Sequence, residues 1–244
     1  MERNGIIYGV HPVLEALSAG RHIERVLIRR EGGGEPLRAI RQAAQHAHVP
    51  VVRVPMEKLD RLVRGEHQGV AAYVSPLPEQ DLDEVISGVY ARGVAPFLLV
   101  LDGVTDVRNV GAIARSAECL GAHAMVIPTS GSARLGPDAV KSSSGALLRV
   151  PVCRIRSLAH ALHRLHDHGL QIVALTEKGA EDLPGIDLSG PLCLVLGGEE
   201  QGISDAVLRL ADHLARIPMS GKLGSLNVSV AAGIALYAAA VQRR

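Results

Sequence analysis

The second half of the chain contains five short, almost continuously apolar runs, separated from one another by segments with helical periodicity. The apolar runs cover residues 97–101, 124–127, 171–175, 192–196 and 214–217. The helical segments lie near residues 109–120, 157–168, 204–212 and 226–242. Apolar strands that alternate with helices are typical of a parallel sheet covered on both faces. This pattern predicts an α/β domain over residues 96–244, with ligands bound beyond the carboxyl ends of its strands.

Residues 1–75 repeat the alternation on a smaller scale. Strands are predicted at residues 6–10, 25–28, 49–54 and 70–74, and helices at 12–19, 37–47 and 56–63. These elements indicate a second, smaller α/β domain. Residues 76–95 begin with a proline-rich connector and continue with an acidic cluster. We therefore predict that residues 76–95 form a linker with one helical segment.

The composition restricts how this chain can contact nucleic acid. Its 244 residues carry a formal net charge of +1, contain no tryptophan, and are only 2% aromatic. That excludes RNA recognition by stacking of bases on aromatic platforms, and a polybasic tail is also missing. Residues 1–75 are the most basic part, with 11 basic and 8 acidic side chains. The composition leaves room for RNA that is held by arginines at particular points.

Targeting and redox signals point to the cytoplasm. No run approaches the roughly 20 apolar residues of a membrane helix, and the N-terminal residues do not resemble a signal peptide. Cys119, Cys153 and Cys193 are odd in number, widely separated and in apolar contexts. We expect buried, reduced thiols in a cytoplasmic protein without membrane contact.

The loop that follows the first strand of the larger domain, residues 102–117, combines a helix start with an arginine. Asn109 is a good helix cap, and Arg115 lies in the first turns beyond it. A capped helix with a solvated arginine explains the pattern equally simply. A functional role for Arg115 is favoured by its apolar neighbours and by its place near the strand ends.

A second loop, residues 197–202, is rich in glycine and contains two carboxylates. Glycines there allow a ligand to approach the backbone closely. The loop matches neither the dinucleotide nor the phosphate-loop pattern, and its carboxylates disfavour a pyrophosphate. A neutral or cationic ligand fits better, and a plain strand-to-helix turn is the alternative.

The third loop, residues 217–229, leads into an unusually apolar helix. Ser225 and Asn227 lie where that helix starts, so capping alone accounts for either one. Residues 228–241 carry hardly a charge. A helix that is apolar nearly all round must be buried on most sides, by its own domain or by a partner subunit.

Together, the strings at residues 101–117, 194–202 and 217–229 resemble the three motifs of the SpoU (TrmH-like) ribose 2′-O-methyltransferases of the SPOUT superfamily. Residues 7–13 and 67–70 are also similar to the RNA-binding N-terminal domain of that family. The resemblance covers nearly the whole chain. It is strongest to the members that methylate a guanosine of 23S rRNA. One departure is Glu200, which stands where the family's second motif often has glycine.

The resemblance implies a SPOUT domain with a deep trefoil knot, preceded by a ribosomal-protein-like α/β domain that binds RNA rather than DNA. It implies S-adenosylmethionine as cofactor, without a metal, and a homodimer packed through the C-terminal helix. The implied catalytic residues are Arg115, Asn109, Glu199, Ser225 and Asn227. The implied cofactor-binding residues are Gly197, Ile217, Leu226 and Thr176.

The implied reaction is attack of a ribose 2′-hydroxyl on the cofactor methyl group, in 23S rRNA by the strongest resemblance. Arg115 has the position of the family's proposed base, yet a guanidinium normally keeps its proton, and anchoring of phosphate is the simpler role. Alternatives are a tRNA or another rRNA site as target, or a non-catalytic RNA-binding protein on the same scaffold. The four histidines at 160, 163, 166 and 168 are predicted to lie on a solvated helix face. Residues 141–145 are predicted either to touch RNA phosphate or to cap a helix.

Overall fold

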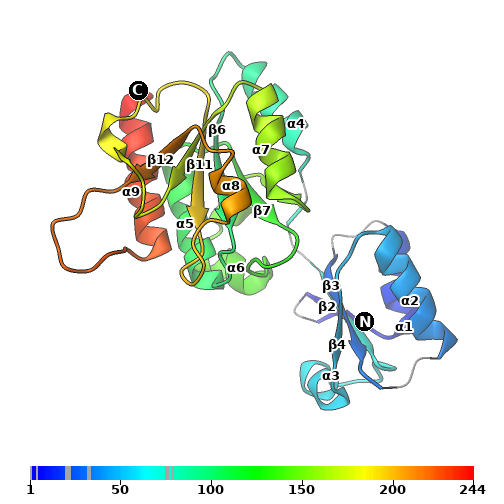
Figure 1. Ribbon diagram of the computed structural model, residues 1–244. Helices are drawn as coiled ribbons and strands as arrows, with labels where there is room; N and C mark the ends of the chain where they lie inside the picture. The colour runs from blue at the N-terminus through cyan, green and yellow to red at the C-terminus, as the bar shows by residue number, and fades with distance from the viewer. Residues whose placement is uncertain (1, 4, 20–22, 32–33, 75–76, 79) are drawn as a thin grey trace. The chain divides into compact units, whose positions relative to one another are not determined.

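The computed structural model describes every residue except 1, 4, 20–22, 32–33, 75–76 and 79 (Figure 1). The chain divides into two compact units, Met1–Pro78 with Leu135–Pro137, and Glu79–Arg134 with Asp138–Arg244. Each unit contains one sheet with helices, which confirms the α/β class predicted for both parts. The predicted boundary at residues 75 and 76 lies outside the described residues.

The first unit is a mixed α/β domain. Its sheet has the order β1-β2-β5-β3-β4, in which only β3 and β4 pair in parallel. Its elements are β1 (Glu2–Arg3), β2 (Ile6–Tyr8), α1 (Val10–Ser18), β3 (Ile23–Arg29), α2 (Glu35–His46), β4 (Val51–Val54), α3 (Met56–Leu62) and β5 (Val70–Val74).

The segment that enters β5 is held by its own polar groups. His67 is buried, and its Nδ1 accepts a hydrogen bond from the Gly69 backbone at 3.0 Å. Gln68 Oε1 accepts a bond from the Val10 backbone, also at 3.0 Å. Gly69 has φ +80°, a conformation that favours glycine. In this structure the residues that resemble the family's N-terminal domain therefore fix a turn between β5 and the start of α1.

The second unit is built on a seven-stranded sheet in which all pairs are parallel. The order is β10-β12-β9-β11-β6-β7-β8. Its elements are α4 (Leu82–Tyr90), β6 (Phe97–Asp102), α5 (Val107–Cys119), β7 (Ala124–Pro128), α6 (Pro137–Ser142), β8 (Val152–Ile155), α7 (Leu158–Asp167), β9 (Gln171–Leu175), β10 (Glu181–Asp182), β11 (Leu192–Gly197), α8 (Asp205–Leu208), β12 (His213–Arg216) and α9 (Val228–Gln242).

Helices cover both faces of this sheet. Side chains of α4, α7 and α8 pack with alternate strand residues, such as Val100 of β6 and Val195 of β11, in one core. Helices α5 and α9 pack against each other, and α9 also contacts β11. Within the described residues, no helix has both the length and the apolar character that a membrane span needs.

The predicted linker, residues 76–95, includes α4. Leu82 and Ile86 of this helix are buried in the same core as side chains of α7. Figure 1 shows α4 next to α7. An ion-pair network joins the two helices: Arg164 lies 2.6 Å from Asp83 Oδ2, and His168 Nε2 lies 3.0 Å from Asp83 Oδ1. The hydrogen bond from Arg164 lowers the pKa of Asp83. Helix α4 is thus packed as part of the second unit.

The end of α9 is bound to a distant loop. Gln242 Oε1 accepts a hydrogen bond from the Leu188 backbone at 2.8 Å. The Arg243 guanidinium donates to the carbonyl of Gly190 and lies 5.1 Å from the centre of the Phe97 ring. These contacts hold residues 242–243 against the 186–190 loop between β9 and β11. The trefoil knot itself remains an implication of the resemblance.

Candidate functional site

The site begins where β6 and β11 end side by side. Asp102 and Gly197, the last residues of these strands, are paired in register. The Gly198 backbone donates to the Asp102 carbonyl at 2.8 Å, and the Asp102 carboxylate accepts from the Ser204 backbone at 2.8 Å. The loop 198–202, which we call the acidic loop, is thereby held over the end of β6.

Two glycines of this region are required by close backbone packing. A Cβ on Gly197 would lie 2.2 Å from the carbonyl carbon of Gly202. A Cβ on Gly198 would lie 2.2 Å from the carbonyl oxygen of Gly103. Neither space admits a methyl group, so any larger residue must displace the backbone. These glycines were predicted to let a ligand approach the backbone. The structure shows that the packing of the loop itself requires glycine at both positions.

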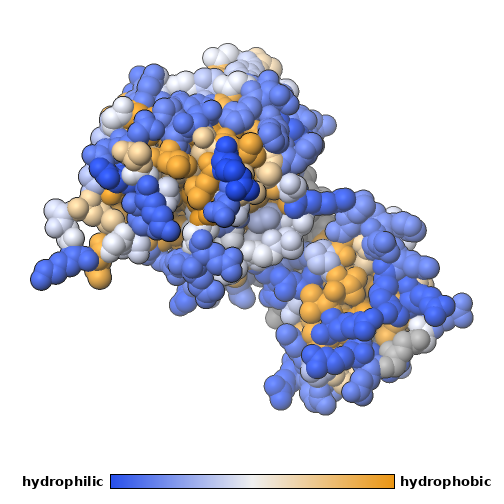
Figure 2. All heavy atoms as spheres, in the orientation of Figure 1, coloured by the Kyte–Doolittle hydropathy of each residue, from blue (hydrophilic) through white to orange (hydrophobic). Residues whose placement is uncertain are grey.

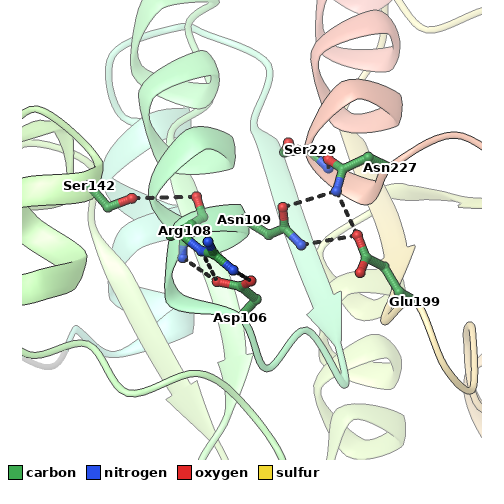
Figure 3. Close-up of polar contacts among 7 residues, drawn as sticks. All are labelled: Asp106, Arg108, Asn109, Ser142, Glu199, Asn227 and Ser229. Atoms are coloured by element: carbon green, nitrogen blue, oxygen red, sulfur yellow. Dashed lines mark hydrogen bonds and ion pairs between the residues drawn. The ribbon is translucent and has the colours of Figure 1, made fainter.

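Three of the predicted catalytic residues meet at this edge of the sheet (Figure 3). Asn109 Nδ2 donates to Glu199 Oε1 at 3.1 Å. Asn227 Nδ2 donates to the same oxygen at 2.6 Å and to Asn109 Oδ1 at 3.1 Å. We call these three side chains the amide–carboxylate cluster. It joins residues 118 positions apart in the sequence, and each comes from a different predicted motif.

The prediction that Asn109 caps its helix is wrong. Asp106 is the cap of α5, and its carboxylate accepts from the Arg108 backbone at 2.7 Å. The Arg108 side chain also pairs with Asp106 at 2.9 Å and lowers the pKa of that carboxyl group. Because Asp106 does the capping, Asn109 lies inside the first turn, and its side chain is free to join the cluster.

For Asn227, the capping prediction is correct and does not compete with a functional role. Its Oδ1 accepts from the Ser229 backbone at 3.0 Å, which caps α9. Its Nδ2 is at the same time the donor to Glu199. Capping therefore fixes the amide in the orientation that presents its donor to the carboxylate.

A cavity of about 540 Å³ opens beside the cluster, and we call it the first cavity. Thr176, Gly197, Ile217 and Leu226, the four predicted cofactor-binding residues, all line it. Ser225, Glu199 and Asn227 line it as well. The structure thus brings together, at one cavity, seven of the nine residues singled out from the sequence.

The first cavity fits a nucleoside cofactor with a positive charge. Its volume lies within the range of about 300–1,000 Å³ that is usual for ligand sites. Aliphatic side chains such as Leu196, Ile217 and Leu226 offer a surface for a flat base. Three carboxylates, Glu177, Glu199 and Glu200, line it against one cation, Lys178, and this excess of negative charge favours a cationic ligand. Glu177 was not predicted, although it follows directly after Thr176 at the end of β9.

Arg115 lies apart from the amide–carboxylate cluster. It is exposed on α5, six residues beyond Asn109, which is about 9 Å along the helix axis. Among the described residues, its side-chain hydrogen bond goes to Ser144 Oγ, at 3.4 Å. Ser144 has φ 53°, in the left-handed region that serine seldom adopts. Residues 141–145 were predicted either to touch RNA phosphate or to cap a helix. In the structure this segment supplies a hydrogen-bond partner for Arg115.

A smaller cavity of about 330 Å³, the second cavity, lies on the other side of the acidic loop. It is lined by residues 102–106 after β6, by Asn109, and by residues 198–202. Glu199 and Glu200 line both cavities. The sequence did not predict this cavity, because the residues that form it lie about a hundred positions apart.

The remaining predictions lie elsewhere in the second unit. His160 and His163 are exposed as expected, but His166 is 3.2 Å from Asp212 and His168 pairs with Asp83. No group of three possible metal ligands occurs within the described residues. Burial raises the pKa of the Cys153 thiol to about 12, and Cys193 is also buried. Cys119 is exposed, so the prediction of a buried thiol is wrong there.

Two family models match different parts of the chain. Residues 96–237 match the model of the SpoU rRNA Methylase family. Residues 6–80 match the model described as RNA 2′-O ribose methyltransferase substrate binding.

Individual relatives cover almost the full length. The chain is 37% identical to the 23S rRNA (guanosine-2′-O-)-methyltransferase RlmB of Pseudomonas putida, over 98% of this chain and 96% of that protein. It is also 37% identical to an uncharacterized tRNA/rRNA methyltransferase of Mycolicibacterium vanbaalenii, over 98% of this chain and 77% of that protein. The crystal structure of the SpoU methyltransferase AviRb from Streptomyces viridochromogenes, in complex with AdoMet, has a TM-score of 0.62 and 28% identity. That match covers 98% of this chain and 90% of AviRb.

The motifs, the amide–carboxylate cluster and these matches agree over both units, and the chain belongs to the SpoU family of RNA 2′-O-ribose methyltransferases.

Proposed function

We propose that this enzyme transfers a methyl group from S-adenosylmethionine to the ribose 2′-hydroxyl of a guanosine in 23S rRNA. The observation that carries the proposal is the amide–carboxylate cluster on the wall of the first cavity. The guanosine and the 23S rRNA are supported by the 37% identity to RlmB over nearly the whole length. A tRNA or another rRNA site remains the alternative, and the cytoplasm is the proposed location.

The first cavity is the proposed cofactor site. Gly197, Ile217 and Leu226 would hold the nucleoside part through backbone groups and aliphatic contacts, and Thr176 would lie at the edge. When bound there, S-adenosylmethionine supplies an electrophilic methyl group on a positively charged sulfur. The carboxylates around the cavity would stabilise that charge.

The cluster is proposed to orient the attacking hydroxyl. Glu199 Oε1 is occupied by the two amides, so Oε2 is the oxygen that accepts a hydrogen bond from the ribose hydroxyl. That bond polarises the O–H group and directs the hydroxyl oxygen toward the first cavity. Glu199 Oε2 then takes up the proton that the hydroxyl loses as the new O–CH3 bond forms and the methyl–sulfur bond breaks. Ser225, which also lines this cavity, is placed to hold the ribose by a further hydrogen bond.

Arg115 is proposed to bind a phosphate next to the target ribose. Its guanidinium is exposed and has a serine hydroxyl, rather than a carboxylate, as its described side-chain partner. It therefore keeps the positive charge and the fork of donors that bind phosphate well. In this role it anchors the RNA and thereby holds the target ribose in place at the cluster.

A homodimer through α9 is the proposed assembly. Four apolar side chains occupy one exposed face of α9 at helical spacing. They are Val230, Ile234, Tyr237 and Val241, which are 49%, 40%, 60% and 47% exposed. An unpaired apolar stripe of this kind on an otherwise well-packed helix is typical of a protein interface. In Figure 2, the hydrophobic residues on the face in view form separate patches among hydrophilic residues.

The target is tested by mapping ribose methylation in total RNA from a strain that lacks the gene. Loss of methylation at a single guanosine of 23S rRNA is the expected result. An unchanged rRNA map together with a lost tRNA position would replace the proposed substrate by the alternative.

A further inference from the structure

The second cavity and the first share one wall. The acidic loop, residues 198–202, lines both of them, and so does Val228. The amide–carboxylate cluster lies at this wall: Asn227 lines the first cavity, Asn109 the second, and Glu199 both. A methyl acceptor must approach the cluster from a side that the cofactor does not fill, because transfer needs the two reactants in line. The second cavity is that side.

The size of the second cavity is sufficient for a nucleotide base. Its volume of about 330 Å³ lies at the lower end of the usual range for ligand sites. Proteins that recognise RNA sequence commonly bind unstacked bases and form hydrogen bonds with their Watson–Crick edges. A ribose at the cluster would have its base within reach of this cavity.

Of the four carboxylates that line the second cavity, three are engaged within the protein. Asp102 accepts from the Ser204 backbone, Asp106 from Arg108, and Glu199 from the two amides. Among the described residues, none forms a hydrogen bond or ion pair with the side chain of Glu200, which is exposed. Glu200 is therefore the carboxylate of this cavity with both oxygens left for a ligand, whereas Glu199 has one oxygen held by the two amides.

We propose that the second cavity receives the base of the target nucleotide and that Glu200 accepts hydrogen bonds from N1–H and N2–H of guanine. Guanine alone presents two adjacent donors on its Watson–Crick edge, and a carboxylate presents two adjacent acceptors. Adenine would place its N1 lone pair against a carboxylate oxygen, and the resulting repulsion selects against it. This assignment rests on the proposed function, since it requires that RNA is the methyl acceptor.

The test compares two enzymes on two RNAs. The RNAs are full-length 23S rRNA transcripts with guanosine or adenosine at the mapped target position, and the enzymes are wild type and Glu200→Gln. Methylated nucleosides are quantified by mass spectrometry after digestion. A glutamine amide offers one donor and one acceptor, which match N1 and N6–H of adenine. We expect kcat/KM for the guanosine transcript to fall about 10- to 100-fold in Glu200→Gln, and the adenosine transcript to gain.

Two further variants make the result specific. Glu200→Gly, which removes the carboxylate without adding a donor, should weaken the preference for guanosine without reversing it. Glu84→Gln, which removes one carboxylate from the exposed face of α4, should leave the preference unchanged. Thermal unfolding of each variant checks that the fold is intact.

The affinity for S-adenosylmethionine, measured by calorimetry, separates base recognition from a cofactor role. An unchanged affinity in Glu200→Gln together with an altered base preference supports the proposal. If the cofactor affinity falls by the same factor as kcat/KM and the base preference stays, Glu200 serves the cofactor and the proposal is wrong. If the wild type methylates neither transcript but binds S-adenosylmethionine, it is the proposed substrate that fails.

Discussion

At the scale of single residues, the site depends on side chains that do two things at once. Asn227 caps α9 through Oδ1 and holds Glu199 through Nδ2. Asp102 ends β6 and fixes the acidic loop through Ser204. Because a structural bond and a functional bond share one side chain, the position of the functional group is set by the fold.

Replacement of Arg115 by alanine should abolish methyl transfer but leave cofactor binding intact. The side chain lines neither cavity and is exposed, so its removal changes the contact with RNA rather than the cofactor site. We expect kcat to fall by at least about 100-fold, as when the reacting groups lose their alignment. The measurement combines single-turnover methylation of 23S rRNA with calorimetric titration of S-adenosylmethionine.

Arg115→Lys distinguishes the possible roles of this residue. A lysine keeps the positive charge but loses the planar pair of donors. Partial activity is expected of a phosphate anchor, and wild-type turnover of Arg115→Ala would contradict the assignment.

Gly198→Ala should destabilise the second unit by about 1–3 kcal/mol, the usual cost of inserting a methyl group into a packed site. The cause is the Gly103 carbonyl oxygen, which would lie 2.2 Å from the new Cβ. Urea unfolding followed by circular dichroism measures the free energy of unfolding.

Gly88→Ala is the matched control. Gly88 lies within α4, and a Cβ there meets nothing within 4 Å. An alanine in a helix should stabilise by about 0.5–1 kcal/mol. Equal effects of the two substitutions would show that the acidic loop is not tightly packed.

At the scale of helices and strands, local patterns predicted much of what the structure has. The strands β9 and β11 and the helix α7 were predicted to within one residue of their bounds, because their apolar periodicity is unbroken. Strand β8 was missed: it has four residues, and Arg154 interrupts the apolar pattern. The start of α5 was placed at Asn109, because Asn109 and Asp106 are both good caps and local sequence does not choose between them.

The site was predicted less completely than the elements. The residues that line the first cavity follow strand ends, and such positions can be read from the sequence. The partner of Arg115 and the second cavity depend on contacts between segments far apart in the chain, such as Arg115 with Ser144. The hydrophobic periodicity of a strand does not indicate which other strands pair with it. The position of β11 between β6 and β9 could therefore not be predicted.

The start of β6 gives the second unit a pH-dependent contribution to stability. His123 Nδ1 accepts a hydrogen bond from the Phe97 backbone at 3.0 Å. Burial, and then the charges of Arg243 and Arg92, lower the pKa of His123. In the unfolded chain this histidine takes up a proton near its ordinary pKa of about 6.5. The unfolded state therefore binds more protons, and the contribution is present above about pH 6.5 and lost as the pH falls.

His123→Asn tests this contribution. An asparagine oxygen can replace Nδ1 as acceptor but does not titrate. The free energy of unfolding of the wild type should fall as the pH is lowered from 7.5 to 5.5, and more steeply than that of His123→Asn. The difference in slope should be at most about 1.4 kcal/mol per pH unit. Parallel curves for the two proteins in denaturant titrations would contradict the assignment.

At the scale of the whole molecule, the two units differ in what they offer. The second unit contains both cavities and the amide–carboxylate cluster. The first unit has its own sheet, its own core and a net positive charge, which suits binding to RNA at places away from the target nucleotide. The division of labour proposed here is chemistry in one unit and RNA capture in the other.

Tyr237→Asp should convert the proposed dimer to a monomer. The substitution places a charge in the middle of the apolar stripe of α9, where it would be buried against a partner without a counter-charge. Light scattering coupled to gel filtration should show the mass fall by half.

Met56→Asp serves as the control for Tyr237→Asp. Met56 is also apolar and exposed, but it lies in the first unit at the start of α3, where an acidic residue suits the helix. It should keep the wild-type mass. A wild type that runs as a monomer at micromolar concentration would contradict the proposed assembly.

The central position of β6 has a consequence for the order of events during folding. Its neighbours are β7, which begins 22 residues after β6 ends, and β11, which begins 90 residues after it. Pairing of β6 with β11 closes a long loop, and the loss of chain entropy precedes the contacts that offset it. We therefore expect this step to be slow. Until it occurs, β6 has an unpaired edge, and neither cavity exists, since the acidic loop lines both. During synthesis, residues 1–78 of the first unit can therefore fold, and RNA can bind to them, before the chain is able to bind its cofactor.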